Sequence, residues 1–275
     1  MRKRCLSKRS TLEQMREYRA EVDQNGFAIV PALLNKEETE SLVQAIANAD
    51  EQDGVRKRGG VYAIRNLLEV VSAAADLAQS PKIMAVATDI LGSNALPVKG
   101  TLFDKTPNAN WLVPWHQDLT ISVKNRIEID GYGPWTRKAG VTHVQPPITI
   151  LERMLAIRIH LDDCDERNGV LRVLPGTHRL GRLNANQIAS TQAGINSVNC
   201  SVKSGGAVLM KPLLVHASSP AMEPSHRRVI HIDFASIALP PGLSWFTDAE
   251  LGRTANRHAF RDDPYDGSSA MMCRE

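Results

Sequence analysis

A histidine and an aspartate stand two positions apart in the segment PWHQD, as His116 and Asp118. Alternate side chains of a β-strand project from the same face, so this imidazole and carboxylate can bind one metal ion. His216, in the apolar run AVLMKPLLVHAS, is the best candidate for a third ligand. Two histidines and a carboxylate on one side of a metal form the facial triad of non-haem Fe(II) oxygenases, which leaves positions open for a co-substrate and O₂.

An arginine at a defined distance strengthens this interpretation. A lone HxD pair is common, and a histidine in an apolar run is more often a core residue than a ligand. Arg227 follows His216 by eleven positions, across a segment rich in serine and proline that is typical of a turn. A guanidinium group can hold a carboxylate with two parallel hydrogen bonds. On a strand Arg228 would face the other way, and the alternative is that both arginines are surface charges.

The elements that must position these residues change in character near residue 93. Residues 11–92 are predicted to be mostly helical, with a capping box at Asn35–Glu38 and a helix start at Ser80–Pro81. Residues 93–236 contain short apolar runs separated by turn residues, which predict a jelly-roll core with helices packed outside it. The segment 124–147 is predicted to be a loop insertion of the kind that often forms a lid.

Several segments together resemble the phytanoyl-CoA dioxygenase family of Fe(II)/2-oxoglutarate oxygenases. They occur in the family's order between about residues 20 and 236: PWHQD at 114–118, NGVLRVLPGTH at 168–178 followed by Arg179-Leu180-Gly181, then His216 and Arg227. The resemblance implies a mainly β fold with flanking helices, a double-stranded β-helix (jelly roll, cupin-like). It also implies hydroxylation with release of succinate and CO₂.

The resemblance further assigns His116, Asp118 and His216 to Fe(II), and Arg227 to the distal carboxylate of 2-oxoglutarate, with O₂ as the oxidant. It implies no catalytic side chain beyond the metal centre. His178 is expected to be structural, because the Pro-Gly-Thr-His segment is better interpreted as a turn. Related halogenases have a small residue in place of the iron carboxylate, so the presence of Asp118 disfavours halogenation.

Four further residues are candidates for contacting the substrate. In the strand MLAIRIHLDD, alternation places Arg158 on the face that would line the barrel, opposite a uniformly apolar face. A buried arginine needs an anionic partner, either a bound carboxylate or an internal salt bridge. Arg65 lies in the helical region before the core, Lys99 on the strand before HxD, and Trp135 in the long loop. If Arg158 and Arg65 point inward, we expect a small anionic metabolite as substrate.

The composition excludes several classes of protein. The 275 residues carry a net charge of +3 and 5% aromatic residues, which disfavour nucleic acid as a partner. No apolar stretch approaches the ~20 residues of a membrane helix. Cys5, Cys164, Cys200 and Cys273 lie far apart, which favours reduced thiols and a cytoplasmic location. The sequence is expected to form one oxygenase domain, 1–275, with a flexible basic tail at 1–10 and a C-terminal tail at 237–275, and it leaves the oligomeric state open.

Two other classes of function remain alternatives. One is a metal-dependent jelly-roll enzyme that does not use 2-oxoglutarate, and the other is a non-catalytic metal-binding relative. Arg227 argues against the first, because that chemistry needs no anchor for a distal carboxylate. The intact set of three ligand candidates argues against the second.

Overall fold

The computed structural model of the chain describes residues 11–49, 55–57, 61–138 and 140–247. The predicted basic tail at 1–10 and residues 248–275 of the predicted C-terminal tail (237–275) lie outside these residues. The described part of that tail is packed rather than loose, since Leu243 and Trp245 are buried in an apolar cluster with residues of β6 (Ile121–Val123) and β8 (Val141–Val144). Within the described part, no helix is both long enough and apolar enough to span a membrane. Cys164 and Cys200 are buried free thiols, whereas Cys5 and Cys273 are outside the described residues.

Helices and strands alternate in the first third of the chain, and strands dominate thereafter. The helices are α1 (Thr11–Asn25), α2 (Lys36–Ala47), α3 (Leu67–Val70), α4 (Ser72–Gln79), α5 (Pro81–Leu91), α6 (Ile148–Glu152) and α7 (Ala185–Gly194), with 3-10 turns at Glu166–Asn168 and Thr177–Leu180. The strands are β1 (Phe27–Val30), β2 (Val55–Lys57), β3 (Val61–Ile64), β4 (Leu96–Asp104), β5 (Val113–His116), β6 (Ile121–Val123), β7 (Trp135–Lys138), β8 (Val141–Val144), β9 (Met154–His160), β10 (Leu171–Val173), β11 (Val198–Cys200), β12 (Ala207–Met210), β13 (His216–Ser218) and β14 (Arg228–Ala235).

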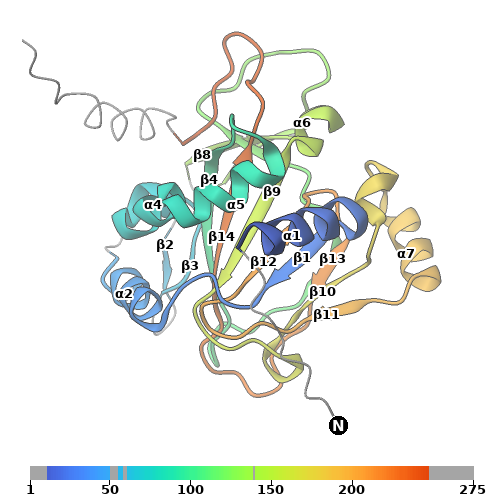
Figure 1. Ribbon diagram of the computed structural model, residues 1–275. Coiled ribbons are helices and arrows are strands. Elements are labelled where there is room, and N and C mark those ends of the chain that lie inside the picture. Colours follow the sequence, from blue (N-terminus) through green and yellow to red (C-terminus); the bar gives the residue numbers. More distant parts are fainter. Residues whose placement is uncertain (1–10, 50–54, 58–60, 139, 248–275) are drawn as a thin grey trace, which may run out of the picture.

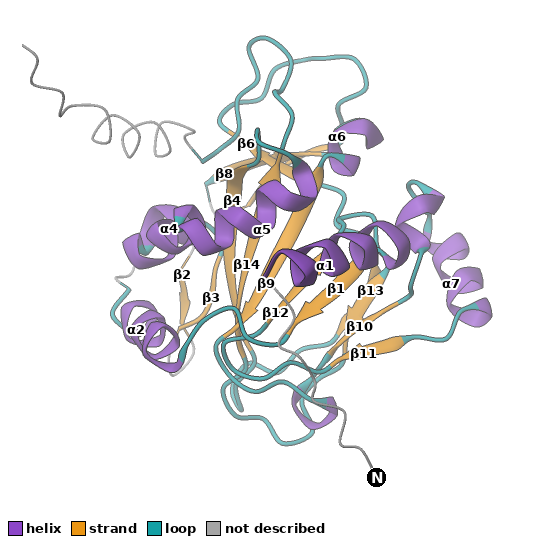
Figure 2. Ribbon diagram, in the orientation of Figure 1, coloured by secondary structure: helices purple, strands orange, loops and turns teal. Residues whose placement is uncertain are grey.

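The described strands form three antiparallel sheets. The large sheet has the order β1-β12-β9-β14-β4-β3-β2, and the smaller sheet has the order β11-β10-β13-β5. The third sheet, β6-β8-β7, lies at the same end of the molecule as α6 (Figure 2). Helices α1, α4 and α5 lie across the large sheet (Figure 1). The large and the smaller sheet together form the double-stranded β-helix that the sequence analysis predicts.

The alternation predicted for β9 is confirmed. Leu155, Ile157 and Ile159 are fully buried in one apolar cluster with residues of α1, α4 and α5. The opposite face of the strand includes the buried His160 and Arg158, of which Arg158 lines the cavity between the sheets. Burial of a continuous apolar face against helices stabilises the large sheet and leaves its inner face free to carry polar groups.

Replacing Ile157 with alanine should therefore lower the free energy of unfolding by about 2–5 kcal/mol, because it leaves a cavity in a close-packed core. Urea unfolding monitored by circular dichroism measures this value. The matched control is Leu12→Ala, because Leu12 is 75% exposed and its truncation should change stability by less than about 0.5 kcal/mol. A similar small loss at both positions would contradict the described packing.

The helix starts agree with the sequence at one position and differ at another. The capping box of α2 is confirmed, since Asn35 Oδ1 accepts a hydrogen bond from Glu38 N at 2.9 Å and Glu38 Oε2 accepts one from Asn35 N at 2.8 Å. Pro81 begins α5 as predicted, but Ser80 does not cap that helix with its side chain. Its hydroxyl instead donates to Leu77 O, at the end of the preceding helix.

Two segments differ from the predicted elements. Residues 61–64 were predicted to be helical but form β3, where Ile64 pairs with Leu102 of β4 and both side chains are fully buried. The insertion 124–147 was predicted to be an irregular loop but includes the β7–β8 hairpin, which pairs with β6. In both cases pairing with another strand outweighs the tendency of the local sequence.

Candidate metal centre

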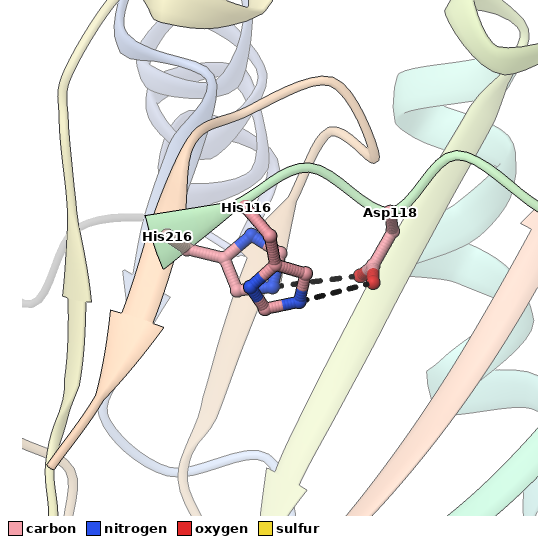
Figure 3. A group of neighbouring side chains, drawn as sticks. All are labelled: His116, Asp118 and His216. Atoms are coloured by element: carbon pink, nitrogen blue, oxygen red, sulfur yellow. Dashed lines mark ion pairs between the residues drawn. The ribbon is translucent and has the colours of Figure 1, made fainter. Parts of the chain in front are cut away.

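Antiparallel pairing of two short strands brings the three predicted ligands together. His116 ends β5 and His216 begins β13, and these residues are directly opposite in the register of the small sheet. Asp118 Oδ1 lies 3.7 Å from His116 Nε2, and Asp118 Oδ2 lies 3.6 Å from His216 Nε2 (Figure 3). The candidate ligand atoms all lie within 4.8 Å of one another. These distances are too long for direct hydrogen bonds and leave room for one ion between the donors.

Backbone carbonyl groups orient both imidazole rings. His116 Nδ1 donates to Pro114 O at 2.8 Å, and His216 Nδ1 donates to Leu214 O at 2.9 Å. A carbonyl oxygen can only accept, so each Nδ1 carries the hydrogen and each Nε2 presents its lone pair. Hydrogen bonds of this kind fix the tautomer and the ring orientation of metal-binding histidines. The two Nε2 atoms therefore face the Asp118 carboxylate ready to act as ligands.

The charges in the centre suit a divalent cation. Burial lowers the pKa of His216 to about 4, so this ring is neutral at pH 7. The enclosed position of Asp118 opposes ionisation, but the surrounding imidazoles hold the pKa of its carboxyl well below the ordinary value. Burial also opposes charge on His116, but its interaction with Asp118 outweighs this effect and raises the pKa of the ring. The carboxylate thus favours positive charge beside it, which a bound metal ion would supply.

Gln117, between the two ligands of the HxD motif, has a role that the sequence analysis did not identify. Its side chain points away from the centre and is buried. Its Nε2 donates to Leu213 O at 2.7 Å and to Gly181 O at 2.8 Å, while its Oε1 accepts from Leu183 N at 2.8 Å. Gln117 therefore connects the HxD segment to the chain that leads into His216. Its place between the two ligand candidates of the HxD motif was the available signal.

We expect Gln117→Leu to weaken Fe(II) binding by about ten- to a hundredfold although every ligand remains, because residues that support metal ligands have effects of this size. Anaerobic titration with Fe(II) measures the change. Gln192→Leu, at an exposed position of α7, is the matched control and should bind Fe(II) like the wild type. Equal affinities in the two variants would show that Gln117 does not support the centre.

A cavity of about 440 Å³ opens beside the three ligand candidates. Arg227, Arg158, Lys99 and Arg65 all line it, together with the three ligand candidates themselves. Arg65 reaches the cavity from the residue that follows β3 rather than from the helix that the sequence predicted. Trp135 does not line the cavity, contrary to prediction. It begins β7 and packs in the apolar cluster beneath the third sheet, because pairing of β7 with β8 turns its ring into that cluster.

Arg158 contacts a histidine, whereas the sequence analysis expected either a bound carboxylate or an internal salt bridge. Its Nη1 donates to His231 Nδ1 at 2.8 Å, and His231 Nε2 donates to Asp233 Oδ1 at 2.9 Å. Asp233 Oδ2 also lies 3.4 Å from Lys99 Nζ. The four residues form a continuous polar chain across β9, β14 and β4. Since Nδ1 must accept from the guanidinium, this chain holds His231 as the Nε2–H tautomer.

Arg227 is buried, with 3% of its surface exposed, and its guanidinium lies in the same cavity. Within the described part of the chain, no carboxylate forms an ion pair with it and its Nε has no hydrogen-bond partner. Burial lowers the pKa of Arg227 to about 10, so it still carries its charge at neutral pH. A buried cation without a counter-ion fits an anionic ligand, such as the distal carboxylate of 2-oxoglutarate.

Several solved structures share this fold. AviO1 from Streptomyces viridochromogenes Tue57 is 23% identical, with a TM-score of 0.59 over 85% of this chain and 99% of that chain. EctD from S. alaskensis, solved with 2-oxoglutarate and 5-hydroxyectoine, is 18% identical, with a TM-score of 0.64 over 86% and 79%. SnoN, a non-heme alpha ketoglutarate dependent epimerase from nogalamycin biosynthesis, is 17% identical, with a TM-score of 0.62 over 95% and 94%. At these identities the likeness concerns the fold.

The family is established by the sequence itself. No curated protein matches the chain significantly. The model of the family Phytanoyl-CoA dioxygenase (PhyH) matches residues 22–229, which include the HxD motif, the second histidine and Arg227. This match spans most of the chain, so the protein belongs to the phytanoyl-CoA dioxygenase family of non-haem iron, 2-oxoglutarate-dependent dioxygenases.

Proposed function

We propose that this protein hydroxylates a small anionic metabolite, using Fe(II), 2-oxoglutarate and O₂, and releases succinate and CO₂. His116, Asp118 and His216 would hold the iron, and Arg227 would bind the distal carboxylate of 2-oxoglutarate. The observation that carries the proposal is the convergence of the three ligand candidates on a cavity that also contains a buried arginine without a counter-ion. A similar structure supports it, since SnoN was solved with Fe³⁺ and alpha ketoglutarate.

The residues of the chain would contribute positioning and charge. Bound iron, together with 2-oxoglutarate and O₂, supplies the oxidising power that converts a substrate C–H bond into C–OH. Three protein ligands on one side leave the opposite side of the centre open to small molecules. Arg227 fixes the far end of the co-substrate, and the polar chain from Arg158 to Lys99 forms the neighbouring wall.

The charge of the cavity supports an anionic substrate. Lys99, Arg158 and Arg227 line it, and Asp118 is the one acid that lines it with them among the described residues, while Asp233 lies 3.4 Å from Lys99. The two charges of Fe(II) and the two of 2-oxoglutarate cancel, so the positive excess of the wall remains after the co-substrate has bound. A carboxylate or phosphate on the substrate would balance this excess.

The proposed activity is tested in two steps on the iron-loaded protein. Addition of 2-oxoglutarate without O₂ should produce a weak visible charge-transfer band, and O₂ should then yield succinate. Succinate release is next measured with a panel of small carboxylates and phosphates, each paired with its neutral amide or alcohol. We expect stimulation by members of the anionic set. Folded, iron-loaded protein that gives no band would favour a jelly-roll enzyme that does not use 2-oxoglutarate, and stimulation by the neutral partners alone would contradict the anionic substrate.

A further inference from the structure

A second cavity, of about 390 Å³, adjoins the cavity of the metal centre, and we call it the annex. The two cavities share four lining residues, which are Arg65, Thr101, Phe103 and Trp111. Tyr62 and Ala63 line only the annex, whereas the three ligand candidates line only the first cavity. Because of this shared wall, the annex lies directly beside the space that the proposed substrate would occupy.

Aromatic side chains form one side of the annex. Only 5% of the residues in the chain are aromatic, yet Tyr62, Phe103 and Trp111 all line this one cavity. The rings of Tyr62 and Trp111 meet edge to face, with 6.2 Å between their centroids and 65° between their planes. All three side chains are half-buried rather than enclosed in the apolar core. Part of each ring therefore remains available to pack against another ring, in the edge-to-face or offset arrangements that aromatic groups prefer.

Hydrogen bonds hold the aromatic wall in place in the absence of a ligand. Trp111 follows Asn110, whose Nδ2 donates to Ala221 O at 2.8 Å and whose Oδ1 accepts from Ala221 N at 2.7 Å. The turn before it is closed by two backbone hydrogen bonds between Thr106 and Ala109, at 3.0 and 3.1 Å. A wall that is already ordered loses little conformational entropy when a ligand binds, which favours binding.

A small residue on β3 keeps the annex open. Ala63 pairs with Phe103 of β4 in the antiparallel register. The Cβ atoms of paired residues lie about 4.5–5.5 Å apart, so a larger side chain at position 63 would lie against the Phe103 ring. Such a side chain would occupy part of the annex without reaching the metal centre.

The inner face of β4 changes from charged to aromatic along its length. Lys99, Thr101 and Phe103 occupy alternate positions of this strand, and all three line the cavity of the metal centre. Lys99 Nζ lies 3.4 Å from Asp233 Oδ2, at one end of the polar chain. Phe103 meets the His231 ring edge to face, with 6.3 Å between centroids. The four residue steps from Lys99 to Phe103 correspond to about 13 Å of strand, so a molecule that contacts both needs a body beyond its anionic group.

We propose that the annex binds a flat, apolar ring of the substrate while the cationic side chains beside it bind the anionic group, so that the substrate is a ring-bearing carboxylate or phosphate. This inference rests on the proposed function and adds a second recognition element to it. The annex supplies apolar area and aromatic edges for the ring, and the wall that contains Lys99 and Arg158 supplies the charge.

Probes that differ from one another in one feature test the inference on the wild type. The acid 4-phenylbutanoate carries a flat ring and an anionic group, butanoate lacks the ring, and 4-cyclohexylbutanoate has a saturated ring in its place. Binding to the full chain, loaded with Fe(II) and 2-oxoglutarate without O₂, is measured by calorimetry. We expect 4-phenylbutanoate to bind about ten- to a hundredfold more tightly than butanoate, and also more tightly than the saturated ring, because a buried flat ring adds both apolar area and aromatic contacts.

Substitutions at the two residues that line only the annex locate the ring. Ala63→Leu should abolish the preference for 4-phenylbutanoate over butanoate, because the leucine side chain takes the place of the ring. Tyr62→Leu should reduce this preference by about two- to tenfold, which corresponds to the loss of one aromatic contact. Tyr132→Leu is the matched control, because Tyr132 packs beside the third sheet and lines neither cavity. It should retain the full preference.

The outcomes separate this inference from the proposed function. Equal affinities of the wild type for 4-phenylbutanoate and butanoate would overturn the inference, as would equal affinities for the flat and the saturated ring, and neither measurement needs a variant. A ring preference that survives in both Ala63→Leu and Tyr62→Leu would place the ring elsewhere and would overturn it as well.

Two further results would bear on the proposed function alone. If the uncharged 4-phenylbutan-1-ol bound as tightly as the acid, the annex would be supported and the anionic substrate contradicted. Iron-loaded wild-type protein that gives no charge-transfer band with 2-oxoglutarate would refute the proposed reaction. The ring preference measured on the iron-free protein would then still decide whether the annex binds a ring.

Discussion

Asp118→Ala should lose Fe(II) binding and 2-oxoglutarate turnover together while keeping its fold. Asp118 supplies the one anionic ligand of the candidate set, and its two carboxylate oxygens face the Nε2 atoms of both histidines. Loss of a supporting residue already costs a metal site about ten- to a hundredfold in affinity, so loss of a ligand should cost at least a hundredfold. The side chain faces the cavity and is partly exposed, so we expect the free energy of unfolding to change by less than about 1 kcal/mol.

Three measurements on one preparation check this expectation: Fe(II) titration, the anaerobic charge-transfer band with 2-oxoglutarate, and urea unfolding. Asp130→Ala is the matched control, because Asp130 is exposed and lies outside the cavity. It should behave like the wild type in all three. Wild-type iron affinity in Asp118→Ala would show that the ion is held by other residues, and would also remove the basis of the proposed reaction.

The candidate metal centre could be predicted from the sequence because two of its residues are close along the chain. His116 and Asp118 lie two positions apart, although β5 ends at His116 and Asp118 follows the strand rather than belonging to it. The order of HxD, His216 and Arg227 identified the remaining partners. The capping box at Asn35 and the apolar face of β9 are local patterns of the same kind. For such features, a window of a few residues contains the physical cause.

The walls of the cavity depend on strand register, which no local pattern contains. Lys99 meets Asp233, and Arg158 meets His231, because β4, β14 and β9 pair with one particular alignment. The sequence therefore identified Arg158 and Lys99 as separate candidates for contacting the substrate and could not show that they belong to one polar chain. Trp135 was a candidate for contacting the substrate because of its residue type in a predicted long loop. Strand pairing within that segment places its side chain against an apolar cluster instead.

The same distinction explains why Gln117 was not given a role. Gln117 acts through three backbone groups that lie far along the chain, at residues 181, 183 and 213. It supports the segment that carries the ligand candidates, and this becomes visible only after the long-range contacts are known.

Arg227→Met should raise the KM for 2-oxoglutarate by a factor between about thirty and several thousand, which corresponds to the 2–5 kcal/mol lost when one partner of a buried charged pair is removed. The guanidinium is buried in the cavity without a carboxylate partner among the described residues, so a bound diacid would be its counter-ion. For the same reason, the apo form of the variant should be at least as stable as the wild type, because methionine removes an uncompensated buried charge. A higher KM for 2-oxoglutarate together with an unchanged or higher free energy of unfolding would distinguish a ligand-binding arginine from a structural one.

Arg228→Met is the matched control for this prediction. Arg228 is adjacent in sequence but faces outward, where its Nε and Nη2 donate to the Asp162 carboxylate at 2.8 and 2.6 Å. Its replacement should leave the KM for 2-oxoglutarate unchanged and lower stability slightly, by about 1 kcal/mol or less for a partly exposed ion pair. Steady-state succinate formation over a range of 2-oxoglutarate concentrations measures KM, and urea unfolding of the apo proteins measures stability. An unchanged KM in Arg227→Met, or equal effects of the two variants, would show that the co-substrate carboxylate binds elsewhere.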